Sequence, residues 1–197
     1  MSTDEVVPEH KGGIKTNTES SIELSTEEQA KEFFQEAKQR LLSINNWHQY
    51  AGSATADFQL TDEKGKSVNR SPQKGDHFKI DIPAPGSVTG DGHDWVQVEE
   101  IEDEEYCIGI RVRPATNPTN ERKDVAHFFS EDATSTFVVK KEGKKITAGV
   151  YGRNEKPNTE TETLKDKVRN AAVATGAISG FSKLQWKTLV NGLIKKD

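Results

Sequence analysis

The sequence predicts an α+β fold in which a curved antiparallel sheet of about seven strands is covered by a long C-terminal helix. Three observations predict it: a helical pattern after Thr26, an alternation of apolar and polar residues over 56–155, and a second helical pattern after Thr163. Strands that follow one another through short turns pair antiparallel, so the middle of the chain is expected to form a meander. A helix at the end of such a meander can cover its concave face.

The first helix has the clearest local signal. The run Ser25-Thr26-Glu27-Glu28 has the form of a capping box, with acidic residues in the first turn. Apolar residues then recur at helical spacing until Asn45-Asn46, where the helix is expected to end. They are Ala30, Phe33, Phe34, Ala37, Leu41 and Ile44.

The strands follow from alternation with a period of two. Residues 21–24 are expected to end a first strand, and Glu142-Gly143 is a tight turn between the last two. The six later strands are predicted within 58–60, 78–82, 95–101, 106–113, 134–140 and 145–153. After the sheet, Leu164 and Val168 lie on one face of the last helical segment, and a bend or break is expected near Gly180.

The domain organisation is expected to be simple. Residues 1–20 are polar and contain Pro8 and Gly12-Gly13, which predicts a flexible N-terminal tail. Residues 21–197 are expected to form a single domain, because the whole chain of 197 residues has the length of one ordinary domain.

Composition excludes several classes of function. With 27 Lys and Arg against 32 Asp and Glu, the net charge of −5 disfavours nucleic acid as a partner. Cys107 is the single cysteine, so disulfides within the chain and thiolate-rich zinc sites are excluded and a cytoplasmic location is expected. The start lacks the apolar core of a signal peptide, and the longest run of small and apolar residues, 171–181, is too short to span a bilayer. A soluble protein without stable membrane insertion is expected.

The order of elements resembles that of a known family. The resemblance rests on residues 21–24, on Trp47-His48-Gln49-Tyr50 after the first helix, on Gly75-Asp76-His77-Phe78 opening a strand, and on the closing segment 164–195. Together they resemble the START-like (SRPBCC) helix-grip superfamily, which includes START lipid-binding domains, plant pathogenesis-related allergens and polyketide cyclase-like proteins. The polar loop 116–124, the polar N-terminal tail and the interrupted last helix depart from that pattern.

The resemblance implies a binding protein for a small hydrophobic or amphipathic, lipid-like ligand held between the sheet and the C-terminal helix. Tyr151 and Arg153 are expected to orient the ligand, with Asn154 beside them at the cavity mouth. His127 is expected in the core or at the mouth. The apolar wall is expected to include Phe78, Ile80, Ile108, Ile110, Phe137 and Trp186.

Less specific explanations compete with these assignments. For Arg153 a pairing with Glu155 or another acid at the end of its strand is favoured over a role in ligand binding. Arg111 and Arg113 alternate with apolar residues, which favours an outward direction and pairing with the acids of 99–105.

Two other functions remain open. A cyclase or hydratase could use the same cavity with His127 or Tyr151 as acid or base, although a protein without catalysis is favoured. An interaction module with a packed core would act through its surface or tail. The five histidines lack metal-ligand spacing, so neither a metal nor a cofactor is expected, and the oligomeric state is open.

Overall fold

The computed structural model describes residues 6–52, 56–82, 86–172 and 178–196, with the backbone alone at 178–181. Seven strands form one antiparallel sheet in the order β1-β7-β6-β5-β4-β3-β2. The strands are β1 (Ile14–Glu23), β2 (Asp57–Thr61), β3 (His77–Asp81), β4 (Asp94–Glu104), β5 (Cys107–Pro114), β6 (Thr134–Glu142) and β7 (Lys145–Glu155). The helices are α1 (Glu27–Leu42), the short 3-10 helix η1 (Ile44–Asn46), α2 (Trp47–Ala51), α3 (Leu164–Ala172) and α4 (Ile178–Leu193).

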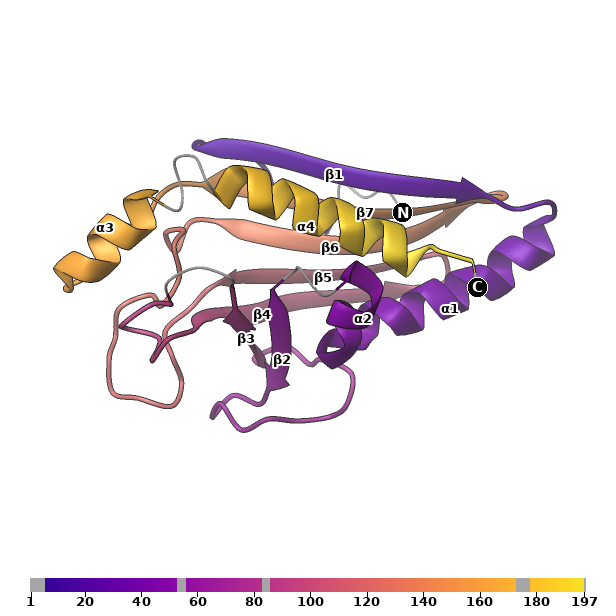
Figure 1. Ribbon diagram of the computed structural model, residues 1–197. Coiled ribbons are helices and arrows are strands. Elements are labelled where there is room, and N and C mark those ends of the chain that lie inside the picture. Colours follow the sequence, from indigo (N-terminus) through magenta and orange to yellow (C-terminus); the bar gives the residue numbers. More distant parts are fainter. Residues whose placement is uncertain (1–5, 53–55, 83–85, 173–177, 197) are drawn as a thin grey trace.

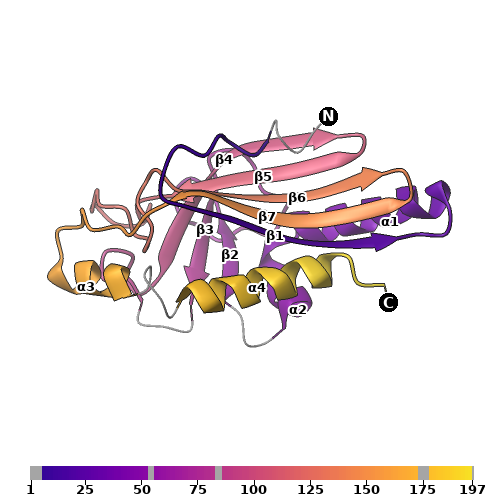
Figure 2. The ribbon, with the colours of Figure 1, turned by 90° about the horizontal axis from the view of Figure 1, so that it is seen from above.

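The sheet curves around α4, which confirms the predicted helix-grip class. Figure 1 shows α4 crossing the concave face between β1 and α2, and Figure 2 shows α4 running beside β1 on one side of the sheet. We call this concave face the inner face and the opposite one the outer face. None of the helices in the described part of the chain is long and apolar enough to cross a membrane.

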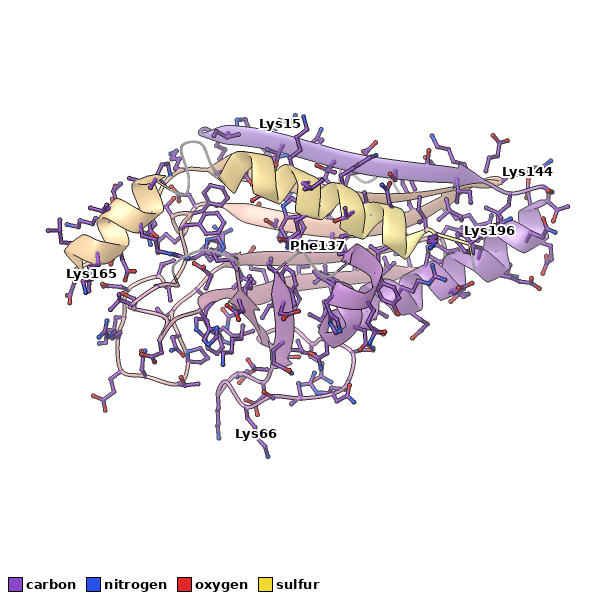
Figure 3. The ribbon with its side chains drawn as sticks, in the orientation of Figure 1. Lys15, Lys66, Phe137, Lys144, Lys165 and Lys196 are labelled. Atoms are coloured by element: carbon purple, nitrogen blue, oxygen red, sulfur yellow. The ribbon has the colours of Figure 1, made fainter. Side chains whose placement is uncertain are left out.

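The register decides which side chains lie on the inner face. Ile110 of β5 pairs with Phe137 of β6, and Phe137 pairs with Val150 of β7. All three are buried in the main hydrophobic core, together with residues of α1, α2 and α4. Phe137 lies near the middle of the sheet, behind α4 (Figure 3). Because successive residues of a strand point to opposite faces, Tyr151 lies on the outer face.

The first helix begins as predicted and ends slightly earlier. Thr26 is its N-cap, and the Thr26 hydroxyl accepts a hydrogen bond from the Gln29 backbone N–H at 3.2 Å. The aromatic residues Phe33 and Phe34 are buried against the sheet. After Leu42 the chain continues through η1 into α2, where the sequence had indicated only a short connection.

The C-terminal segment is interrupted, as expected, and only its second part crosses the sheet. It forms two helices, α3 and α4, and α4 begins at Ile178 and runs through Gly180. The expected apolar face of α3 points to solvent, since Leu164 is 75 % exposed and Val168 is 64 % exposed. The buried side chains of α3 are the polar Asp166, Arg169 and Asn170.

The N-terminal segment contributes more structure than a tail. β1 begins at Ile14, so residues 14–20 belong to the sheet rather than to the predicted tail. Further upstream, Val6 is buried on the outer face beside Tyr151 and Val138. The Arg111 guanidinium donates a hydrogen bond to the Val6 carbonyl at 3.1 Å. Residues 14–20 pair with β7 through the backbone. The alternation of apolar and polar residues did not predict this pairing.

Candidate ligand-binding site on the inner face of the sheet

An aromatic cluster fills the middle of the inner face. The ring of Trp47, from α2, lies 5.2 Å from that of Phe58, 5.8 Å from Phe78 and 4.7 Å from Phe137. Trp186 of α4 extends the cluster, with its ring 5.3 Å from Phe137. The indole N–H of Trp47 donates a hydrogen bond to the Leu41 carbonyl at 3.0 Å, which satisfies its buried polar atom. These five residues are called the aromatic cluster below.

The predicted apolar wall is brought together by this geometry. Phe78, Ile108, Ile110 and Phe137 are buried in one core, with Ile80 beside them, and Trp186 packs against it with part of its surface exposed. Much of that wall contacts Trp47 and α1, so the middle of the concave face is packed with protein side chains.

Side chains become small and polar beyond the aromatic cluster, toward the start of β1. Ser135 of β6 pairs with Gly152 of β7, one step past the pair of Phe137 and Val150 on the same face. Ser135 is partly exposed, and Thr16, which pairs with Gly152 from β1, is exposed. With the nearby Glu155, these residues form what we call the open end: Thr16, Ser135, Gly152 and Glu155.

Glu155 reaches the inner face through a β-bulge. The pairing of β1 and β7 shifts between Ile14 and Thr16, and Asn154 has a left-handed φ of 56°. The extra residue turns the Glu155 side chain to the face of Gly152, where a Cβ would lie 2.3 Å from Glu155 Oε1. The Thr16 hydroxyl donates to Glu155 Oε2 at 3.3 Å. Glycine at position 152 is therefore needed for the carboxyl to lie there.

The Glu155 carboxyl is buried, with only 7 % of the residue exposed. Burial raises the pKa of Glu155 to about 7, although the Thr16 hydrogen bond and the Arg153 charge both oppose the rise. The carboxyl thus changes its charge near neutral pH. A buried acid with this property on the inner face is a candidate for ligand recognition.

Glu155→Gln is expected to stabilise the protein at alkaline pH and to change little in acid. A carboxyl whose pKa is raised on folding loses stability as pH climbs from its unfolded value toward its folded value. For the shift at Glu155, from 4.5 to about 7, that loss is on the order of 3 kcal/mol by pH 8. Urea unfolding of both proteins at pH 4.5 and pH 8 measures it. Equal differences between variant and parent at the two pH values would contradict the assignment.

A second polar group lies at the start of β4. Asp94 pairs with Ile80 in register and so faces inward, and it is fully buried. The Arg169 guanidinium of α3 donates to both of its oxygens, at 3.1 Å and 2.5 Å. This bidentate ion pair attaches α3 to the sheet, assisted by Asp166, which accepts hydrogen bonds from the backbone N–H groups of Val88 and Thr89.

His127 lies close to this ion pair and is buried. Its Nδ1 accepts a hydrogen bond from the Phe129 backbone N–H at 3.0 Å, which places the proton of the neutral ring on Nε2. Burial lowers the pKa of His127 to about 4, with Asp94 opposing the shift and Arg169 adding to it. His127 is thus neutral at pH 7, and its ring packs against Phe128 with centroids 4.3 Å apart.

Tyr151, Arg153 and Asn154 do not join the other predicted site residues. The Tyr151 hydroxyl donates to Glu19 at 2.6 Å on the outer face, and burial together with this bond raises the pKa of Tyr151. Asn154 Oδ1 accepts a hydrogen bond from the Lys11 backbone N–H at 2.7 Å. All three residues belong to β7. Alternation directs Val150 and Gly152 inward, so these three do not face the side of the sheet where Phe137 lies.

The outward prediction for two arginines is confirmed. Arg111 forms ion pairs with Glu99 and Glu100, and Arg113 pairs with Glu99 at 2.5 Å. Arg153, for which pairing with Glu155 was the alternative, instead donates to the Asn17 side chain at 2.7 Å and to the Thr16 carbonyl at 3.0 Å.

Two inner-face groups were missed by the sequence reasoning. Asp94 carried a usable signal, since it precedes Val96 and Val98 at a spacing of two and therefore shares their face. Glu155 carried none, because its direction depends on a bulge and on the glycine beneath it.

Comparisons with known proteins support the fold. No family model matches the chain, and no curated protein is similar to it in sequence. A hypothetical protein from Helicobacter pylori has a similar structure, with a TM-score of 0.55, 13% identity, and coverage of 92% of this chain and 86% of the other. A major latex-like protein from Panax ginseng matches at a TM-score of 0.38, with 13% identity over 83% of this chain and 94% of its own. The Helicobacter pylori structure shows a shared fold.

Proposed function

We propose that this protein binds a small hydrophobic or amphipathic, lipid-like molecule at the open end of the inner face, beside the aromatic cluster. The observation that supports the proposal is the change along one face of the sheet, from packed aromatic rings to Ser135 and Gly152, and then to a buried carboxyl next to the exposed Thr16. A ligand's apolar part would contact the rings and its polar part would reach the carboxyl.

Membership of the START-like superfamily is part of this proposal, as is a cytoplasmic location. The helix-grip arrangement supports the first. The second rests on the single cysteine.

Fluorescence of N-phenyl-1-naphthylamine, a neutral apolar probe, tests the binding function. Emission should rise on titration into the protein, and Ser135→Leu should weaken the binding because it fills the open end. Ser21→Leu provides the matched control, since Ser21 is exposed on the outer side of β1. Equal binding by the Ser135 variant, or no probe binding by the parent, would refute the proposal.

The second candidate function is binding of a partner through the protein surface, by an interaction module with a packed core. One observation favours it. Leu164 and Val168 present an apolar surface on the exposed side of α3, while Trp47 fills the middle of the sheet's concave face. The same titration separates the two functions. A parent protein that does not bind the probe would favour the module.

A further inference from the structure

The Glu155 carboxyl indicates the chemistry of the ligand's polar end. Of its two oxygens, Oε2 accepts the hydrogen bond from Thr16, and among the described residues Oε1 accepts none. The carboxyl lies directly over Gly152, where a side chain would exclude it. One acceptor atom on the inner face therefore has no donor among the described residues.

The carboxyl also makes no ion pair within the described part of the chain. Arg153 is the charged residue that acts on it, but the Arg153 Nη1 donates to Thr16, Asn17 and Gly152 and makes no ion pair with Glu155. An ionised carboxylate removed from water without a cation is unfavourable. A cationic ligand would replace the hydration that the carboxylate loses on burial by an ion pair, whereas an anionic ligand would be repelled by the carboxylate.

Resting on the proposed function, we infer that the ligand is a cationic amphiphile, an amine whose protonated nitrogen binds Glu155 Oε1 while its apolar part lies toward the aromatic cluster. An ammonium group donates the charge-assisted hydrogen bond that Oε1 lacks.

The pH dependence of binding follows from the same group. The carboxylate form increases as pH rises through the pKa of about 7, while an alkyl amine remains protonated to about pH 10. Thr16, the other residue in contact, does not titrate, and Arg153 stays charged over this range. Preference for the amine should therefore increase between pH 6 and pH 8.

Competition against N-phenyl-1-naphthylamine tests the inference with two ligands of equal chain length, decylamine and decanol. At pH 8 the amine should displace the probe at a concentration about tenfold lower than the alcohol. Glu155→Gln should reduce this ratio to about one while probe binding is kept. Gly152→Ala should reduce it too, because the added Cβ displaces the carboxyl. Glu160→Gln, at an exposed position, is the matched control and should keep the parent ratio.

The outcomes distinguish this inference from the proposed function. If the parent does not bind the probe, the proposed function fails and the inference fails with it. If the probe binds but the amine and the alcohol compete equally at pH 8, the amine inference alone is wrong. Decanoic acid serves as a third competitor, and displacement by the acid as effective as by the amine would also overturn it. Melting temperatures of the variants show that each remains folded.

Discussion

Trp47→Ala is expected to lower the free energy of unfolding by about 3–5 kcal/mol, a large fraction of the stability of a single domain. Trp47 is 1 % exposed and its ring contacts three other rings across the sheet. Truncation removes that burial and leaves a cavity among the packed rings. It also leaves the Leu41 carbonyl without the indole donor.

Urea unfolding followed by far-UV circular dichroism measures this loss. Trp47→Phe should recover part of it, because a ring remains in the cluster while the hydrogen bond is still missing. Leu184→Ala is the control, since Leu184 lies on α4 and is 63 % exposed, so its truncation should cost less than about 0.5 kcal/mol. Similar losses for the Trp47 and Leu184 variants would show that the aromatic cluster does not stabilise the fold.

The cavity left by Trp47→Ala also bears on function. If apolar ligands lie beside the aromatic cluster, the variant should bind N-phenyl-1-naphthylamine at least as well as the parent under conditions where it stays folded.

Alternation predicted the sheet well because most of its information is local. The pattern through Phe78, Ile80, Ile108 and Ile110 identified the inner face, and the structure brings these residues into one core. The same rule places Tyr151 and Arg153 on the face opposite to Val150, whereas their place at a cavity mouth was expected from their chemistry and not from their register.

The missing parts of the prediction depend on contacts between distant segments. Residues 14–20 read as a polar tail because an edge strand that pairs with β7 on one side needs few apolar side chains. Glu155 turns inward because Asn154 adopts a left-handed conformation opposite the start of β1. The apolar residues of α3 were expected to pack against the sheet, but they are exposed. A buried ion pair attaches this helix to the sheet instead.

That ion pair gives the second large prediction. Replacing Arg169 by methionine leaves the Asp94 carboxylate fully buried without a partner, and the expected loss is about 3–5 kcal/mol. Asp94→Leu removes the carboxylate that pairs with the buried Arg169 guanidinium and should cost a similar amount. The double variant removes both charges, so its stability should exceed that of either single variant, and a double-mutant cycle measures the coupling.

Hydrogen exchange measures which part of the fold loses stability in the Arg169 and Asp94 variants. α3 is attached by Arg169 and by the hydrogen bonds of Asp166 to Val88 and Thr89, so the amides of α3 should lose protection in the single variants before those of β6 and β7 do. Lys165→Met, on the exposed side of the same helix, is the matched control and should change neither measurement. A double variant no more stable than the single ones would show that the two charges do not stabilise each other, and the hydrogen bonds of Asp166 and Asn170 would then hold α3.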